Sequence, residues 1–187
     1  MDSVRKYFSG MVVLNDEEWE AFSAGLRRRE IRKKSYLLEA GQDCSFIAFV
    51  EEGTFRFYHQ IDGEEKITAF FFQHDFVTNY RSFLTGEPSS HHIEALTDSA
   101  VWSIQRDYLF GLYDRFPKLD RLGRYVAENL YLRVASRLDT FLYYTPAERY
   151  EALVQRNSRL LQEVPQYMLA SYLGVTAESL SRIRARK

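Results

Sequence analysis

The segment from Pro165 to Lys187 constrains the fold of this chain more than any other. It reads PQYMLASYLGVTAESLSRIRARK, and its apolar residues have the spacing of two short helices that pack across a turn: Leu169, Leu173, Val175, Leu180 and Ile183. Ala170 is small where the helices would cross, and Gly174 can turn the chain through left-handed backbone. Thr176 can cap the second helix. The pattern predicts a helix-turn-helix, a unit that places its second helix in the DNA major groove.

The predicted second helix has one face suited to reading bases. Glu178, Ser181 and Arg182 lie together at i, i+3 and i+4. Arg182 can donate two hydrogen bonds to guanine O6 and N7, and Glu178 can accept one from cytosine N4. The expected DNA contacts are Thr176, Glu178, Ser181, Arg182, Arg184 and Arg186. A structural explanation stays open for part of this set, because first-turn carboxylates and last-turn cations complement the dipole of any helix.

The charge distribution is compatible with this prediction. The whole chain has a net charge of −1, but from Tyr144 onward seven Arg or Lys face four Glu, which leaves +3 on that segment and −4 on residues 1–143. A mildly basic end on an acidic body suits a protein that presents one end to DNA. The imbalance is modest, so it supports the motif without deciding the function.

Several other classes of protein are not expected. The first residues lack the apolar core of a signal peptide, and no stretch approaches the roughly 18–20 apolar residues that cross a bilayer, so we expect a cytoplasmic protein. No Gly-rich phosphate loop, nucleophile elbow or triad signature is present, which argues against an enzyme. The single cysteine, Cys44, excludes an internal disulfide and cannot alone hold an iron–sulfur cluster.

Metal binding is weakly indicated at most. His91 and His92 are adjacent, and adjacent residues on a strand point to opposite faces of the sheet. We therefore expect no metal site and no cofactor.

The front of the chain has the signals of an antiparallel β structure. A short helix is expected over residues 12–29, and from Ile31 to about Ser103 aromatic and β-branched runs alternate with glycine-containing turns. The Asp62-Gly63 pair between two such runs predicts a β-hairpin. Several short strands at this spacing indicate a sandwich or barrel.

A long helix should follow, from about Pro117 to Phe141. Its apolar stripe repeats about every 3.7 residues, close to the helical period, and Tyr125, Tyr131, Leu132 and Leu142 add apolar surface beside it. One small barrel could hardly cover so much apolar surface, so we expect this helix to pack also on the same helix of a second subunit. The expected dimer contacts are Leu119, Leu122, Val126, Leu130 and Val134. Burial within a monomer is the alternative.

The segment Thr145-Pro146-Ala147-Glu148 is a capping box with proline at the first helical position, so a new helix begins there. The expected organisation is an effector domain over residues 1–116, a connecting helix over residues 117–143 and a helix-turn-helix domain over residues 144–187. The fold class is α+β.

This organisation resembles the cyclic-AMP receptor protein/FNR (CRP/FNR) family of transcription regulators. The resemblance is carried by AFVEEGTFRFYHQ at residues 48–60, the long helix, and LGVTAESLSRIR at residues 173–184, where Glu178, Ser181 and Arg182 match the E-x-x-S-R reading motif. It implies a cyclic-nucleotide-binding-like jelly-roll barrel and a homodimer on a two-fold symmetric site in double-stranded DNA, with RNA polymerase as a further partner. Haem-sensing relatives use axial His or Cys ligands, so the resemblance leaves His74 or Cys44 open as a haem ligand beside a structural role. Many relatives add a β-hairpin wing after the recognition helix, whereas this sequence ends at Lys187, so weaker backbone contacts are expected.

The nucleotide site departs from the family pattern. The phosphate-binding segment of the family reads F-G-E-L and later R-[ST]-A, whereas this chain has residues 76–80 as FVTNY and residues 89–92 as SSHH. Without the ribose-binding Glu and the phosphate-binding Arg, a buried cyclic phosphate would lose a charge-assisted contact. Cyclic-AMP control is therefore not expected, and the pocket is either degenerate or altered for an unidentified small-molecule effector. Its expected lining is Phe72, Phe76, Thr78, Asn79, Tyr80, Ser89 and Ser90.

A competing interpretation comes from a different class of protein. The chain could be a small-molecule-binding or protein-interaction module whose terminal helices dock a protein partner. Arg182 and the basic C-terminal residues argue against this interpretation, and failure to select any DNA sequence would favour it.

Overall fold

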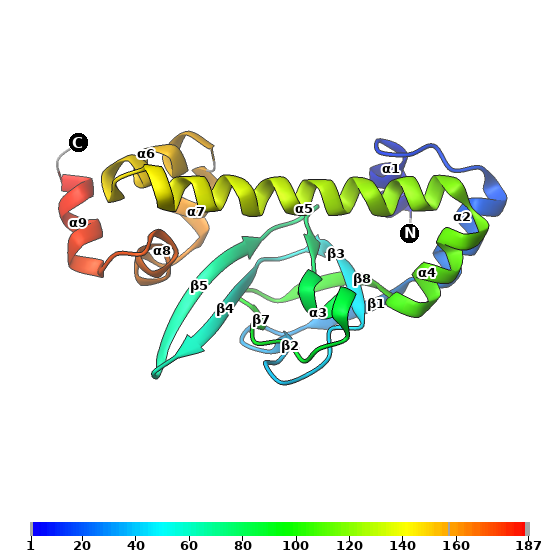
Figure 1. Cartoon of the computed structure of the whole chain (residues 1–187), viewed down its shortest axis with the longest axis horizontal. Coiled ribbons are helices and arrows are strands. Elements are labelled where there is room, and N and C mark those ends of the chain that lie inside the picture. Colours follow the sequence, from blue (N-terminus) through cyan, green and yellow to red (C-terminus); the bar gives the residue numbers. More distant parts are fainter. Residues whose placement is uncertain (1, 157, 186–187) are drawn as a thin grey trace. The chain divides into compact units, whose positions relative to one another are not determined.

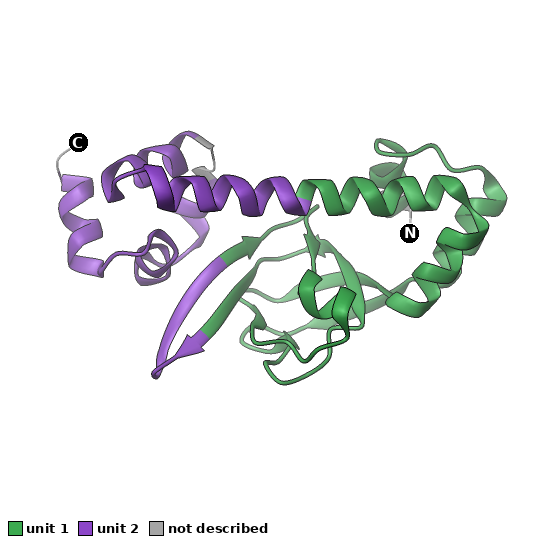
Figure 2. Cartoon of the chain, viewed as in Figure 1, with its two compact units in different colours: residues 1–59, 69–129 green, residues 60–68, 130–187 purple. Residues whose placement is uncertain are grey.

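The structure, a computed structural model, describes residues 2–156 and 158–185. The chain divides into two compact units, shown in different colours in Figure 2. The first unit holds residues 1–59 and 69–129, and the second holds residues 60–68 and 130–187. The second unit therefore combines the C-terminal helices with a short piece from the middle of the β region.

Two short helices precede the strands, one further helix lies between the sixth and seventh strands, and the remaining helices follow the last strand, so the β-rich front and helical back occur in the order that the sequence indicates (Figure 1). The strands are β1 (Arg27–Ile31), β2 (Tyr36–Leu38), β3 (Phe46–Glu52), β4 (Phe55–Ile61), β5 (Glu64–Phe71), β6 (Phe76–Val77), β7 (His92–Ala95) and β8 (Ser99–Gln105). The helices are α1 (Asp2–Ser9), α2 (Asp16–Ala24), α3 (Tyr80–Thr85), α4 (Arg106–Arg115), α5 (Pro117–Tyr143), α6 (Pro146–Arg156), α7 (Ser158–Glu163), α8 (Gln166–Leu173) and α9 (Ala177–Ala185).

The strands form two four-stranded sheets, with the orders β1-β8-β3-β6 and β2-β7-β4-β5. Their inward residues form one apolar core, which includes Phe55, Ile93 and Val101, each 0% exposed. This arrangement of antiparallel strands confirms the predicted α+β class with a jelly-roll-like barrel.

The predicted hairpin lies between β4 and β5. Asp62 has φ 51° and Gly63 has φ 80°, so both central residues of the turn are left-handed. This is the requirement of the type I′ turn, whose twist matches that of the two strands that it joins. The Asp62-Gly63 prediction is confirmed.

The predicted N-terminal helix is shorter than expected. α2 begins after Asn15, whose side chain accepts a hydrogen bond from the Glu18 amide (2.8 Å) while the Glu18 carboxylate accepts one from the Asn15 amide (2.7 Å). The helix ends at Gly25, because residues 27–31 pair with β8 as strand β1. Three consecutive arginines hide that strand from a hydropathy pattern, since four of its five residues are exposed.

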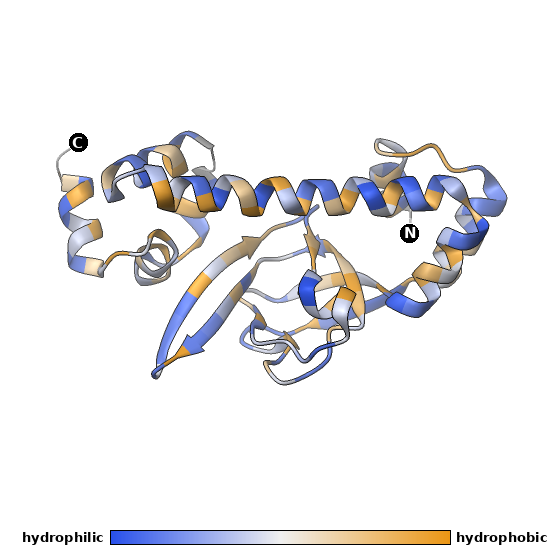
Figure 3. Cartoon of the chain, viewed as in Figure 1, coloured by the Kyte–Doolittle hydropathy of each residue, from blue (hydrophilic) through white to orange (hydrophobic). Residues whose placement is uncertain are grey.

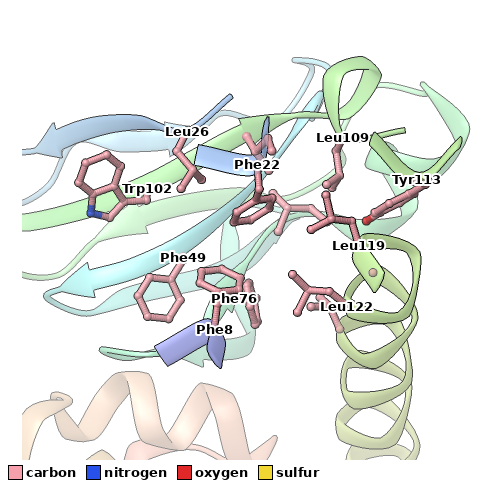
Figure 4. Close-up of a pocket in the computed structure, with 14 residues that line it drawn as sticks. Phe8, Phe22, Leu26, Phe49, Phe76, Trp102, Leu109, Tyr113, Leu119 and Leu122 are labelled. Carbon is pink, nitrogen blue, oxygen red and sulfur yellow. The ribbon is translucent and has the colours of Figure 1, made fainter. Parts of the chain in front are cut away.

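Helices cover the outer face of the sheet that contains β3 and β8. Apolar residues of α1, α2, α4 and the first turns of α5 pack on these strands in a second apolar core. Within this core is a cavity of about 30 Å³, around which Phe8, Phe22, Phe49, Leu119 and Leu122 converge (Figure 4). Drug-sized ligands occupy pockets of roughly 300–1,000 Å³, so this cavity is far too small for one.

The helix α5 has a buried beginning and an exposed end. Leu119, Leu122 and Val126 are at most 6% exposed, whereas Val134 is 68% and Leu138 is 56% exposed. Hydrophobic residues nevertheless recur along the whole helix (Figure 3). No helix in residues 2–156 or 158–185 combines the length and apolarity that a membrane span requires.

Candidate nucleic-acid interface

The predicted helix-turn-helix is formed by α8 and α9. Gly174 ends α8 with φ 68° and ψ 38°, and the Val175 amide donates to the Ala170 carbonyl (3.0 Å), which closes the turn. Leu169, Ala170, Leu173 and Leu180 are at most 2% exposed and form the contact between the two helices. The apolar spacing in the sequence thus gave the correct helix pair.

The second helix begins with a side-chain cap. The Thr176 hydroxyl accepts a hydrogen bond from the Ser179 amide (3.2 Å), as expected for an N-cap. Thr176 also donates to the Ser179 hydroxyl (3.1 Å). Its side chain therefore stabilises the start of α9, and a contact to DNA would have to share the same oxygen.

The residues predicted to read bases lie on an exposed face of α9. Glu178, Ser181 and Arg182, called the reading face below, are all exposed, and so is Arg184. The Arg182 guanidinium makes one hydrogen bond, from Nη2 to the Ser179 hydroxyl (3.2 Å), which leaves several of its N–H groups for a ligand. Arg186, also predicted as a DNA contact, lies outside the described residues.

The charge state of Glu178 suits hydrogen-bond acceptance. Its own backbone N–H, then the Thr176 hydroxyl and the positive charge of Arg182 hold the pKa of this carboxyl below its usual range. The carboxylate is consequently ionised at neutral pH. An ionised carboxylate is an acceptor only, which fits the N4 amino group of cytosine.

Two arginines from outside the helix pair hold the end of α8. The Arg137 guanidinium lies 3.6 Å from the centre of the Tyr172 ring and donates to the Tyr172 carbonyl. Arg149 Nε donates to the Leu173 carbonyl (3.0 Å). These are carbonyls of the last helical turn, which have no partners inside the helix. Neither arginine could be predicted from the sequence, because no spacing links them to a helix that is more than 20 residues away.

The same region explains why position 174 requires glycine. Apart from the left-handed backbone, a Cβ added there would lie 2.8 Å from the Phe141 ring. Arg137 and Arg149 lie over the other parts of that ring, with their guanidinium carbons at 4.5 and 4.8 Å from its centre. The turn of the helix pair is thus packed against the end of α5.

The helix that follows α5 begins as predicted. The Glu148 amide donates to the Thr145 hydroxyl (3.3 Å), and the Thr145 amide donates to the Glu148 carboxylate (2.7 Å). This is the reciprocal capping box, and α6 starts at Pro146. The change of direction between α5 and α6 is therefore encoded locally.

The buried polar residues of the expected effector pocket are hydrogen-bonded within the protein. Asn79 Nδ2 donates to the Ser89 hydroxyl (2.6 Å), which in turn donates to the His91 carbonyl (2.7 Å). The Asn79 side chain also caps α3 by accepting from the Ser82 amide (3.3 Å). Thr78 donates to the Phe46 carbonyl (2.9 Å). Thr78, Asn79 and Ser89 are thus buried and satisfied by the protein itself.

The aromatic residues expected around this pocket lie elsewhere. Phe76 and Tyr80 pack into the core between helices and sheet, and Phe76 lines the small cavity of Figure 4. Phe72 is buried and Ser90 is exposed. The structure therefore brings together Thr78, Asn79 and Ser89, and it directs Phe76 and Tyr80 to the opposite face of the sheet.

The interior of the barrel near these residues holds a histidine instead of an arginine. The His91 ring stacks on Phe57 with a centroid distance of 4.4 Å. Burial, followed by the neighbouring His59 and His92, lowers the pKa of His91 to about 4. His91 is therefore neutral at physiological pH and cannot replace the guanidinium that would balance a phosphate.

The two alternative haem ligands are not placed as a site. Cys44 is 1% exposed, and its amide donates to the Ser82 hydroxyl (2.9 Å). His74 is exposed and stacks on Tyr7, with ring centres 5.1 Å apart. Where the structure describes the chain, no three His, Cys, Asp or Glu residues come close enough to hold a metal ion.

The cyclic nucleotide-binding domain family model matches residues 28–116, a stretch that contains all eight strands except the first residue of β1. The whole fold resembles that of FixK2 from Bradyrhizobium japonicum, with 20% identity, coverage of 86% of this chain and 83% of that chain, and a TM-score of 0.74. It also resembles the c-di-GMP responsive global regulator CLP from Xanthomonas campestris (16% identity, coverage of 92% and 91%, TM-score 0.71). No curated protein sequence matches the chain significantly.

A third similar structure is a regulator assigned to the crp/fnr family, from Eubacterium rectale, with 17% identity, coverage of 92% of this chain and 83% of that chain, and a TM-score of 0.70. These likenesses show that the chain has the fold of CRP/FNR-type regulators. The order of barrel, long helix and helix pair is the one that the sequence analysis expected.

Proposed function

We propose that this protein is a sequence-specific DNA-binding transcription regulator of the CRP/FNR type that acts as a homodimer. The observation that carries the proposal is the reading face of α9, which is exposed while Leu169, Leu173 and Leu180 of the helix pair are buried and Thr176 caps α9. Glu178, Ser181 and Arg182 offer there the acceptors and donors that distinguish base pairs in a major groove. The shared fold with known regulators supports the same function.

The exposed end of α5 supports a dimer. Ala127, Tyr131, Val134, Leu138 and Phe141 are spaced alternately by four and three residues, which is the a and d spacing of a coiled coil. Tyr131, Val134 and Leu138 are 56–71% exposed within the chain. These five residues, called the seam below, would be covered by the same residues of a second copy.

The seam replaces part of the interface that the sequence analysis expected. Leu119, Leu122 and Val126 already pack in the core of their own chain and have no surface left for a partner. Leu130 and Val134 remain available, since Leu130 is half-buried and Val134 is exposed. The helix carries two apolar stripes, of which the earlier serves the chain itself and the later is the proposed dimer contact.

The barrel, on this proposal, does not respond to cyclic AMP. Asn79 and Ser89 bond to each other, and His91 is neutral, so none of these three residues supplies a positive charge to balance a phosphate. We expect about 1 mM cyclic AMP to raise the melting temperature by less than about 1 °C. A site with a Kd of about 10 μM would add about 2.7 kcal/mol under these conditions, which is several degrees for a protein of this size. A saturable rise of that size, absent with ATP, would disprove this part of the proposal.

The proposed function is tested by selecting bound duplexes from a randomised DNA pool with the purified protein. We expect a palindrome whose half-sites lie about ten base pairs apart, centre to centre. Arg182→Ala should weaken binding by about 1–3 kcal/mol and relax base choice at one position in each half-site. Competition binding with single-base variants of the selected site measures both the loss of affinity and the change in base choice.

Arg184→Ala is the matched control, because Arg184 is also exposed but lies away from the reading face on α9. Its loss should weaken binding to all sequences alike and make the salt dependence shallower. If Arg182→Ala behaves in the same way, Arg182 contacts only phosphate. If the wild-type protein enriches no sequence at all, the proposal is wrong, and a protein partner for the terminal helices becomes the better explanation.

A further inference from the structure

The strand β5 lies at the edge of its sheet, next to β4 only. An edge strand has backbone N–H and C=O groups that no neighbouring strand satisfies. In this chain, two of these groups bond to one side chain of α8. The Ile67 amide donates to the Ser171 hydroxyl (3.1 Å), and the same hydroxyl donates to the Glu65 carbonyl (2.7 Å).

A single hydroxyl can serve both groups because it has one donor hydrogen and two acceptor lone pairs. Ile67 is 4% exposed and Ser171 is half-buried, so water has little access to the contact. The hairpin tip, residues 60–68, also falls in the same compact unit as residues 130–187 (Figure 2). The contact joins positions that are 104 and 106 residues apart in the sequence.

The contact fixes α8 on a side that the arginines leave free. Arg137 and Arg149 bind the carbonyls of Tyr172 and Leu173 at the end of the helix. Ser171, the residue before Tyr172, binds the hairpin tip through its own side chain. The reading face of α9 stays exposed in this arrangement, so the hairpin contact does not block a DNA groove.

We propose that Ser171 is a positioning residue for DNA binding, which ties the helix-turn-helix unit to the β4–β5 hairpin and so limits the orientations of α9. This inference rests on the proposed function. A helix-turn-helix that is held in this way loses less orientational freedom when it binds DNA. This favours simultaneous contact of the two subunits of a dimer with two half-sites. The contact should matter little when only one half-site is present.

The first experiment measures the contact without DNA. In Ser171→Ala, hydrogen exchange at the Ile67 amide should be about tenfold faster, as the loss of one hydrogen bond predicts. Ser171→Thr keeps the hydroxyl and should restore slow exchange. Ser23→Ala, which removes an exposed hydroxyl bonded only to the nearby Glu20 carbonyl in α2, is the control and should leave Ile67 unchanged. Unchanged exchange in Ser171→Ala would show that the contact does not hold the hairpin.

The second experiment compares duplexes with two half-sites and with one. Ser171→Ala should bind the two-half-site duplex about five- to tenfold more weakly, and the one-half-site duplex less than about twofold more weakly. Ser171→Thr should bind the two-half-site duplex with the affinity of the wild type. Circular dichroism checks that both variants fold. Equal losses on both duplexes, no loss, or tighter binding by Ser171→Ala would overturn the positioning role. If the wild-type protein binds no DNA, the proposed function fails, while the exchange experiment still tests the contact.

Discussion

Replacing Val134 and Leu138 together by glutamate is expected to convert the protein into a monomer. Both side chains are more than half exposed within the chain, so the substitutions should cost the fold little. In a dimer they would place four carboxylates in the middle of an apolar seam, where charges lack partners. Binding to the two-half-site duplex should then fall by at least about a hundredfold, because the second half-site is no longer engaged by a linked partner.

Sedimentation equilibrium measures the first effect and competition binding the second. Leu132→Glu is the matched control, because Leu132 is 62% exposed on the same helix but lies off the seam. It should leave both the mass and the affinity unchanged. A double variant that remains dimeric would place the interface elsewhere, and a monomer with unimpaired palindrome binding would contradict the homodimeric mode of DNA recognition.

The parts of the fold that the sequence predicts best are those with a local cause. The Asp62-Gly63 turn needs left-handed backbone at two adjacent residues, and the start of α6 needs Thr145 and Glu148 three residues apart. The helix pair around Gly174 depends on apolar positions within one short segment. Each requirement is met by neighbours in the chain, so its pattern is visible without the tertiary structure.

Long-range contacts could not be predicted in this way. The apolar residues along α5 predict that the helix packs on a partner surface, but a periodic pattern does not reveal which surface that is. Leu119 and Val134 were both expected at the dimer interface, yet Leu119 is 0% and Val134 is 68% exposed. Ser171 is a further case, because its partners in β5 are more than 100 residues away.

The expected lining of the effector pocket shows a different limit of sequence reasoning. Phe76 and Tyr80 were expected there because residues 76–80 correspond to the phosphate-binding segment of the family, whereas the structure packs both against the core between helices and sheet. The strand β6 ends at Val77 and α3 begins at Tyr80, so a strand pattern holds for only two residues of this segment. Thr78, Asn79 and Ser89 were expected in the same lining, and all three are buried; Asn79 donates to Ser89, whereas Thr78 donates to the Phe46 carbonyl.

Leu119→Ala separates the two roles of α5, because this residue was expected at the dimer interface and the structure places it in the core. Its side chain is 0% exposed and borders the existing cavity of about 30 Å³. Truncation would enlarge that cavity, and comparable substitutions destabilise proteins by about 2–5 kcal/mol. We therefore expect a melting temperature lower by roughly 5–15 °C, with the dimer mass unchanged.

Val134→Ala provides the comparison, since it removes apolar surface from the seam and not from the core. It should weaken self-association measurably. The free energy of unfolding of the dissociated protein should stay within about 0.5 kcal/mol of the wild-type value. Denaturation at protein concentrations far below the dimer dissociation constant, combined with sedimentation at higher concentrations, distinguishes the two effects. If Leu119→Ala instead dissociates the dimer with no loss of monomer stability, α5 packs on its partner along its whole length, and the assignment of its first stripe to the core is wrong.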